Sequence, residues 1–279
     1  MSKAHIYQIV YDETSDARRD PGFLRLDNFA NLRPDWFEYW PIRNYLLGVS
    51  LEDDDYYGFL SPRFAVKSGL SSDVVFATLE GRTEDVVIFS PYLDESALFL
   101  NVIEHGDSYH RGLASIFARA TAAYWQPRRL IQSSSQIAFS NSFIARAPFW
   151  RRWLEICESI FAVAENRQSL LGAQLALPTW YGPRQGYAFK VFVVERVAST
   201  ILGMEPGWTS IAPLALTMPM RQIPAEPLRD DLIRLDELKR EAALAADPEP
   251  LLREYSSVRR RLNAIISPPA PPSTEAAHR

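Results

Sequence analysis

Three short segments rich in β-branched and aromatic residues constrain the fold more than any other feature of this chain. They are HIYQIVY (5–11), YYGFLSPRF (56–64) and EDVVIFSPY (84–92), and each runs into turn or polar residues. Stretches with apolar residues at helical spacing lie between them and after them. Strands that alternate with helices predict an α/β fold in which helices flank the sheet.

The same patterns predict the other elements. Residues 12–23 form a polar loop with a Pro-Gly turn, and residues 134–146 resemble a strand. The expected helices cover 33–48, with a kink or break at Pro41; 71–79, where a strand is the alternative; 96–125, as two helices broken near Gly106; 147–166; and 187–204, where a strand that runs into a helix is the alternative.

The character of the chain changes after Pro224. Its 279 residues suit one large domain or two small ones. We expect an α/β domain over 1–224, a charged helical hairpin over 225–266 and a disordered proline-rich tail over 267–279. We interpret the hairpin as packing on the α/β domain or on a second copy of the chain. The alternative is that its arginines lie on an anionic membrane surface.

The bulk composition excludes several classes of protein. A formal net charge of −4 argues against a nucleic-acid binder. Cys157 is the one cysteine, so the chain has no internal disulfide, and this suits a reducing compartment. Neither a signal-peptide pattern nor an apolar run of membrane-spanning length occurs. The expected location is the cytoplasm, with peripheral contact at the inner membrane left open.

Ligands of α/β sheets bind beyond the carboxyl ends of the strands. Ser61, Pro62 and Arg63 follow the second strand, and Lys67 comes one helical turn later. A guanidinium binds phosphate oxygens with two parallel hydrogen bonds, and a lysine adds a point charge. An ordinary ion pair with a neighbouring acid is the equally weighted alternative.

Two groups of residues could be metal ligands, but their positions in the sequence do not establish a metal site. Asp53 and Asp55 could hold Mn²⁺ or Mg²⁺ on a diphosphate, but they precede the strand, so a solvated turn is the favoured interpretation. His105 and His110, with Asp107 between them, lack an evident third ligand and are interpreted as surface or helix-end histidines.

Two further polar residues stand in unusual surroundings. Asn141 lies between a strand and an amphipathic helix, where an amide either binds a sugar or serves a turn. Glu195 lies in the apolar run VFVVERVA, so it either pairs with Arg196 or Arg146, or has a pKa that burial shifts for catalysis. Motifs typical of common hydrolases, P-loop proteins and dinucleotide-binding proteins do not occur.

Four pieces in order resemble the glycosyltransferases of capsular-polysaccharide and O-antigen synthesis that have a GT-A-like fold. Their helix with a glutamate and paired aromatic residues is similar to residues 27–46, and their Asp-hydrophobic-Pro strand to 84–91. YYGFLSPRF resembles their strand with Gly and His-Tyr-Arg-Arg, although the His-Tyr is absent. Residues 139–155 and 189–202 resemble their asparagine-strand-helix and Glu-Arg-Leu pieces.

The resemblance covers about residues 5–204. It implies transfer of a sugar from a nucleotide-sugar donor to a glycan or lipid-linked acceptor of bacterial surface polysaccharide. It also implies that Ser61-Pro62-Arg63 takes the place of a metal-binding D-x-D, which favours Arg63 over a metal. A non-catalytic carbohydrate-binding or scaffold subunit is the competing class, and another kind of α/β enzyme is the third.

These arguments give a set of predicted site residues. A general base beside the acceptor hydroxyl is expected at Glu195, Asp94 or Glu95, with Arg63 on the leaving diphosphate. Tyr7, Gln8 and Asp12, at the end of the first strand, are expected to hold the base and ribose of the donor, and Ser61, Lys67 and Asn141 complete the donor site.

Overall fold

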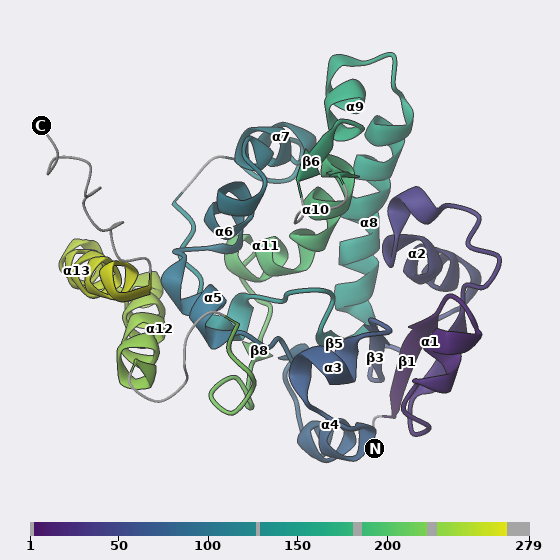
Figure 1. The fold of residues 1–279 in the computed structure, drawn as a ribbon, viewed down its shortest axis with the longest axis horizontal. Coiled ribbons are helices and arrows are strands. Elements are labelled where there is room, and N and C mark those ends of the chain that lie inside the picture. Colours follow the sequence, from purple (N-terminus) through teal and green to yellow (C-terminus); the bar gives the residue numbers. More distant parts are fainter. Residues whose placement is uncertain (1–2, 127–128, 181–185, 222–227, 267–279) are drawn as a thin grey trace, which may run out of the picture.

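A mixed six-stranded sheet lies at the centre of the protein, and helices cover both of its faces (Figure 1). The computed structural model describes residues 3–126, 129–180, 186–221 and 228–266. The strand order is β2-β1-β3-β5-β4-β8, and a separate hairpin joins β6 to β7. The strands are β1 (Ala4–Val10), β2 (Leu24–Asp27), β3 (Tyr56–Leu60), β4 (Val86–Ile88), β5 (Phe143–Arg146), β6 (Pro178–Trp180), β7 (Gly186–Ala188) and β8 (Ser210–Ile211).

Strand direction decides which loops meet at the site. β1 pairs in parallel with β2 and β3, and β4 pairs in parallel with β8. β5 runs antiparallel to both β3 and β4. The carboxyl ends of β1, β3 and β4 therefore share one edge of the sheet with the amino end of β5. The α/β fold that the sequence predicts is confirmed.

The helices divide between the two faces of the sheet. Tyr57 and Phe59 of β3 pack towards α2, α7, α8, α10 and α11, whereas Tyr56 and Leu60 pack towards α3 and α4. Every residue of β3 is buried, as expected for a central strand with both faces covered. The helices are α1 (Glu13–Ala17), η1 (Pro34–Trp36), α2 (Tyr39–Gly48), α3 (Phe64–Ser68), α4 (Ser72–Leu79), α5 (Leu93–Leu98), α6 (Val102–Tyr109), α7 (Leu113–Ala120), η2 (Ser134–Gln136), α8 (Ala147–Glu165), α9 (Leu170–Leu175), α10 (Phe189–Glu195), α11 (Val197–Met204), α12 (Arg229–Leu244) and α13 (Glu249–Ile266).

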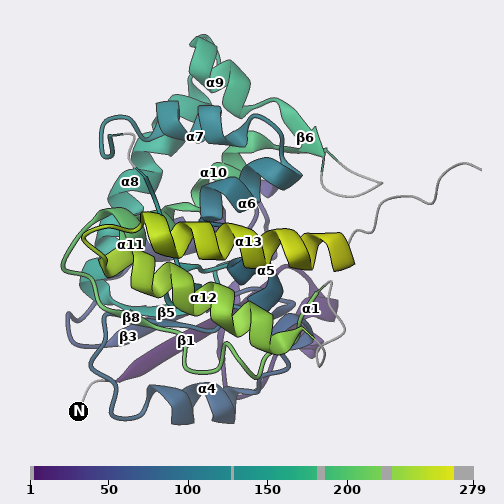
Figure 2. The ribbon, with the colours of Figure 1, turned by 90° about the vertical axis from the view of Figure 1, so that its left-hand side faces the viewer.

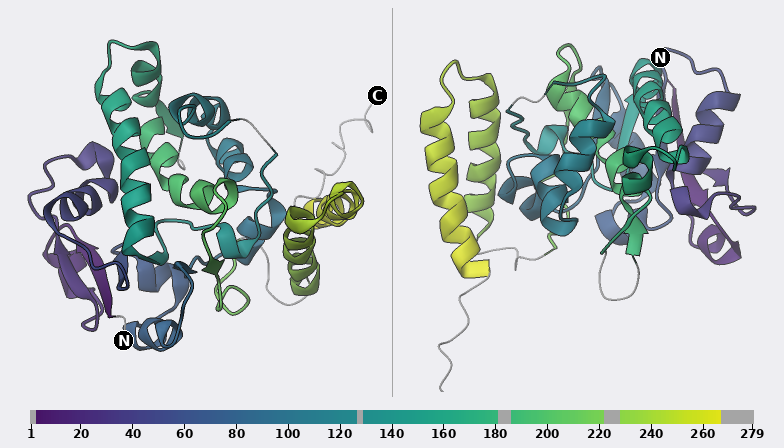
Figure 3. Two further views of the ribbon diagram at one scale, coloured as in Figure 1. Left: turned by 180° about the vertical axis from the view of Figure 1, so that it is seen from behind. Right: turned by 90° about the horizontal axis from the view of Figure 1, so that it is seen from above.

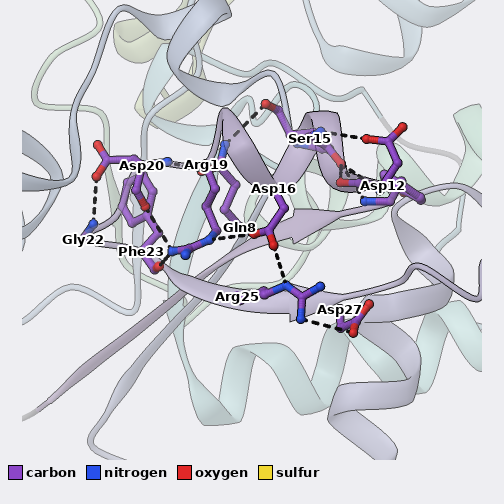
Figure 4. A network of polar contacts seen from close by, with 12 residues as sticks. Gln8, Asp12, Ser15, Asp16, Arg19, Asp20, Gly22, Phe23, Arg25 and Asp27 are labelled. Atoms are coloured by element: carbon purple, nitrogen blue, oxygen red, sulfur yellow. Dashed lines mark hydrogen bonds and ion pairs between the residues drawn. The ribbon is translucent and has the colours of Figure 1, made fainter.

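The segment 12–23 is not the loop that its composition predicts. Asp12 caps the short helix α1: its carboxylate accepts a hydrogen bond from the Ser15 backbone N–H (2.7 Å), and the Ser15 hydroxyl closes a reciprocal capping box. Figure 4 shows this cap beside the contacts of Asp20, whose backbone N–H donates to the Gln8 side chain (3.0 Å). The polar residues of this segment thus cap a helix and fix a turn.

Two predicted interruptions fall at other residues. The break within 33–48 lies at Phe37, which has a backbone φ of 47°, and Pro41 lies in the first turn of α2, where a proline is tolerated. Residues 96–125 contain the end of α5 and two more helices, and Gly106 lies inside α6. Gly112, with a φ of 96°, separates α6 from α7.

The buried Arg196 packs against Gly106 so closely that this position of α6 has no room for a side chain. A Cβ atom at this position would lie 2.1 Å from the Arg196 Nε and 2.6 Å from a Leu113 methyl group. We therefore expect Gly106→Ala to lower the free energy of unfolding by about 1–3 kcal/mol through overpacking. Gly48, at the end of α2, has open space around its Cα, so Gly48→Ala is the matched control. Urea unfolding should show a loss in the first variant only; equal stability of the two would contradict this packing argument.

Other predictions are confirmed in whole or in part. α8, α12, α13 and the helix within 71–79 form where the sequence predicts them. Within 134–146 only the last four residues form a strand, and a 3-10 turn precedes them. Within 187–204, β7 leads into α10, and Arg196 separates α10 from α11. The predicted tail 267–279 and the domain boundary near 224 lie outside the described residues.

The α12–α13 hairpin packs against α5, at one side of the body (Figures 2 and 3). Leu232, Leu235 and Leu238 are buried in this contact. The Tyr255 hydroxyl donates to the backbone oxygens of Ala97 and Leu98 at 3.1 and 2.9 Å. The hairpin is therefore part of the folded body of its own chain.

Candidate functional site

Three connected hollows form a cleft at the carboxyl edge of the parallel strands. The inner hollow has a volume of about 270 Å³, the middle hollow about 400 Å³ and the outer hollow about 610 Å³. The inner and middle hollows share Arg63, Lys67, Ser140, Phe192 and Glu195. The middle and outer hollows share Tyr11, Phe37 and Tyr187.

Two cations from the end of β3 lie in this cleft. Arg63 precedes α3 and is exposed, and within the described part of the chain its guanidinium has no hydrogen-bond or ion-pair partner. Lys67, in the last turn of α3, donates from its Nζ to the Ser140 hydroxyl at 2.9 Å. An exposed guanidinium beside an ammonium group provides a site for a phosphate or diphosphate.

The turn that enters β5 brings polar groups to the same place. Ser140 and Asn141 both have φ of 52°, in the left-handed region. The Ser140 backbone N–H donates to the Glu195 carboxylate (3.0 Å), and the Asn141 amide donates to the Glu38 carboxylate (3.0 Å). Because β5 is antiparallel to its neighbours, its first residues rather than its last ones reach the cleft.

Residues with a strained backbone conformation cluster around this cleft. Among the described residues, five that are not glycine have a positive φ, and all five line one of the three hollows. Such conformations cost about 1–3 kcal/mol each and persist where the surroundings hold them, which is common at functional sites. The residues are Asn31, Phe37, Tyr92, Ser140 and Asn141.

Two carboxylates, those of Glu38 and Glu195, line the middle hollow. Glu195 forms an ion pair with the buried Arg196 (3.2 Å) in addition to its contact with Ser140. Burial raises the pKa of the Glu38 carboxyl, and the Glu195 charge adds to this rise, whereas Lys67, Ser61 and Asn141 lower the pKa. The two carboxyl groups therefore have different surroundings although they share one hollow.

A second polar group closes the far end of the inner hollow. The buried Glu95 carboxylate contacts the His105 Nε2 at 2.9 Å and accepts hydrogen bonds from the Tyr109 hydroxyl at 2.9 Å. Burial lowers the pKa of His105, and the Glu95 contact opposes this shift. Arg221 lies 3.8 Å from Glu95 on the same wall.

The predicted histidine group agrees in part with the favoured interpretation, because His110 lies at the end of α6 although neither histidine is on the surface. His105 and His110 are buried, and His110 stacks on Phe192 with ring centroids 3.6 Å apart. The Asp107 carboxylate accepts the backbone N–H groups of Gly112 and Ala114, so it serves the turn between α6 and α7. Within the described ranges, no three His, Cys, Asp or Glu side chains gather closely enough to hold a metal ion.

The structure brings about half of the predicted site residues together. Arg63, Lys67, Glu195, Ser61 and Asn141 all line the middle hollow. Each of them follows a strand at the shared edge, precedes β5 or ends α10. The rule that ligands bind at the carboxyl edge of a parallel sheet predicts that Arg63 and Lys67 lie at the site.

The residues predicted from the first strand lie elsewhere. The Tyr7 hydroxyl is within 2.7 Å of the Tyr45 hydroxyl, because Tyr7 points from the sheet towards α2. Gln8 is buried and donates to the backbone oxygens of Ser61 and Pro62, both at 3.3 Å, so it braces the loop after β3. The Asp12 carboxylate caps α1, and these hydrogen bonds lower its pKa.

Asp94 and the acidic run are also outside the cleft. Asp94 is fully buried and accepts the Arg221 backbone N–H, whereas its neighbour Glu95 lines the inner hollow. Asp53 pairs with Arg151, and Asp55 contacts the His5 ring at 2.9 Å, at the opposite edge of the sheet. The structure thus places the alternative metal ligands in a turn, apart from the three hollows.

Glu38 and Tyr11 line the cleft without being among the predicted site residues. Glu38 follows the strained Phe37, and Tyr11 follows the last residue of β1. Burial raises the pKa of Tyr11, and the Glu38 charge adds to the rise. The available signal was the sequence WFEYW, in which one acid stands between two pairs of aromatic residues.

Comparison with protein-family models, curated proteins and solved structures finds no match to this chain. The fold and the cleft are therefore the basis for an argument about function. Of the helices that the structure describes, none has both the length and the apolar composition needed to cross a membrane.

Proposed function

We propose that this chain is a glycosyltransferase that moves a sugar from a nucleotide-sugar donor to a glycan or lipid-linked acceptor of a bacterial surface polysaccharide. The observation that carries the proposal is the middle hollow, where Arg63 and Lys67 face Glu38 and Glu195. Glycosyl transfer builds negative charge on the leaving diphosphate and positive charge on the sugar. A cleft that holds both cations and carboxylates suits both charges.

The rest of the cleft also suits this substrate. Tyr11, Phe37, Tyr187 and Phe192 offer aromatic surface for a nucleobase or a sugar ring. The mixed sheet with its parallel β2-β1-β3 half is compatible with the GT-A-like fold that the sequence resemblance implies. This function places the chain in the cytoplasm, and at the inner membrane where the acceptor is lipid-linked.

The first test is donor binding by thermal shift with UDP-, GDP-, CMP- and dTDP-sugars, each with Mn²⁺ and with EDTA. We expect one donor to raise the melting temperature in both conditions. Arg63→Ala should weaken binding of that donor about 10-fold to 100-fold, because hydrogen bonds to charged groups contribute about 1.5–3 kcal/mol. Arg260→Ala is the matched control, since Arg260 is an exposed arginine on α13, outside the cleft.

The other outcomes are equally informative. Stabilisation that requires Mn²⁺ and is lost in Asp53→Ala and Asp55→Ala would move the donor site to the opposite edge of the sheet. Donor binding with no turnover on any acceptor would favour the carbohydrate-binding subunit. No stabilisation by any donor would contradict the proposal.

A further inference from the structure

Glu38 directly follows Phe37, one of the residues at which the middle hollow meets the outer one. Its own side chain lines the middle hollow, and the ring of the preceding Phe37 lines both. Phe37 meets Tyr187 edge-on, with ring centroids 4.9 Å apart, at this opening. The middle hollow therefore meets the outer hollow at the residue that precedes Glu38, and it meets the inner hollow at Arg63 and Lys67.

The residues on either side of Glu38 are anchored. The Trp36 indole N–H donates to Glu165 (3.0 Å), and the Tyr39 hydroxyl donates to Glu158 (2.6 Å). Both acceptors lie on α8, and Trp36 and Tyr39 are almost fully buried. These contacts hold the strained backbone at Phe37, so the Glu38 carboxylate is presented from a rigid support.

The two carboxylates of the middle hollow have different partners. The Glu195 carboxylate is paired with the Arg196 guanidinium and accepts the Ser140 backbone N–H, so protein groups already engage its oxygens. Glu38 has no ion pair within the described residues: it accepts a hydrogen bond from the neutral Asn141 amide, and Ser61 and Lys67 lie near enough to lower its pKa. The groups that face Glu38 from the neighbouring elements are Tyr11, Ser61, Arg63, Lys67 and Glu195.

We propose that Glu38 is the general base of the reaction and that the acceptor hydroxyl reaches it from the outer hollow. This inference rests on the proposed function. The acceptor oxygen forms a bond to the anomeric carbon while the bond from that carbon to the diphosphate oxygen breaks. The electron pair leaves with the diphosphate beside Arg63 and Lys67, the acceptor proton passes to the Glu38 carboxylate, and a single displacement inverts the anomeric centre.

The Glu38 environment also predicts the pH dependence. A base acts in its ionised form, and burial raises the pKa of Glu38 above its ordinary value of 4.5. Activity should therefore fall as the pH falls through this raised pKa, which places an acidic limb above pH 4.5.

The experiment compares Glu38→Gln, Glu38→Asp, Glu195→Gln and Glu80→Gln in the full chain. The probes are the nucleotide sugars of the donor panel, with water and a set of p-nitrophenyl glycosides as acceptors. Release of the nucleotide, a nucleoside diphosphate or CMP from a CMP-sugar, gives kcat across pH. Thermal shift gives donor binding, and NMR gives the anomeric configuration of the product.

We expect Glu38→Gln to lower kcat at least 100-fold, to bind donor within about threefold of the wild type, and to lose the acidic limb. Glu38→Asp should retain the acidic limb and show a smaller loss of kcat. This variant replaces Glu38→Gln in the test if Glu38→Gln does not fold. Glu195→Gln should keep the acidic limb whatever its loss of rate. Glu80, an exposed residue at the end of α4, is the control, so Glu80→Gln should match the wild type.

Several results would overturn the inference while the proposed function stands. They are a kcat for Glu38→Gln within threefold of the wild type, an acidic limb that persists in that variant, and a product with retained configuration. If the wild type neither binds a donor nor releases the nucleotide, the proposed function fails and the inference fails with it.

Discussion

Replacing Trp150 by alanine is expected to lower the free energy of unfolding by about 3–5 kcal/mol, the range for a large buried aromatic residue. Trp150 lies on α8 and is fully buried. Its ring centroid lies 4.8 Å from that of Phe59 on β3 and 4.7 Å from that of Phe143 on β5. Its indole N–H also donates to the Tyr57 backbone oxygen at 2.8 Å.

The loss should be followed by urea unfolding with circular dichroism as the signal. Trp150→Phe is the matched control, because it keeps an aromatic ring and loses the indole hydrogen bond, and we expect a smaller loss of about 1–2 kcal/mol. A loss below about 1 kcal/mol in Trp150→Ala would show that the core collapses into the vacated space without penalty.

The consequence for the cleft follows from which strands Trp150 contacts. β3 leads directly into Ser61 and Arg63, and β5 begins after Asn141. Trp150 thus holds together the two strands whose ends carry the polar groups of the middle hollow. We expect the alanine variant, where it remains folded, to bind the donor more weakly as well.

Much of the fold could be predicted from the sequence because burial leaves a strong pattern in long or fully covered elements. β1 and β3 are rich in β-branched and aromatic residues, and the 19 residues of α8 carry an apolar stripe. The short elements could not be predicted in the same way. The short helix α1 depends on one capping residue, Asp12. Gly106 looks like a helix breaker in the sequence, but it stands within α6 where Arg196 fills the space that a side chain would occupy.

The candidate site divides along the same line. Arg63 and Lys67 were predictable because they directly follow a recognisable strand. The prediction that Tyr7 and Gln8 hold the donor is not supported by their positions. Adjacent side chains of β1 point to opposite faces of the sheet, and these two contact Tyr45 and the loop after β3. Glu38 and Glu195 lie 157 positions apart in the sequence, and only the packed arrangement of η1, α2 and α10 puts them in one hollow.

The other large effect is expected from Asp236→Ala in the α12–α13 hairpin. The buried Asp236 carboxylate accepts hydrogen bonds from the Ser134 backbone N–H (2.6 Å) and the Ser134 hydroxyl (2.7 Å). Truncation leaves these buried donors without their acceptor, so we expect a loss of about 3 kcal/mol. Glu237→Ala is the matched control, because this neighbouring acid is exposed, and it should stay within about 0.5 kcal/mol of the wild type.

A buried lysine beside Asp236 adds to this cost. Lys239 donates from its Nζ to the backbone oxygens of Ser96 and Phe99. Burial lowers the pKa of Lys239 to about 8, and the Asp236 charge opposes this shift. Removing the carboxylate therefore makes the ionised lysine still less favourable at neutral pH. The hairpin loses its contact with Ser134 of η2, and its lysine contact with α5 is weakened as well.

The effect should reach the inner hollow, because α5 carries Asp94 and Glu95. Hydrogen exchange is expected to rise over α5 and α12 in Asp236→Ala while the β1–β3 pair stays protected. Unchanged exchange together with unchanged stability would mean that Leu232, Leu235 and Leu238 hold the hairpin by apolar burial alone. A rise confined to α12 and α13 would separate the hairpin from the cleft, and the Glu95 wall would then be held by its contacts with His105 and Tyr109.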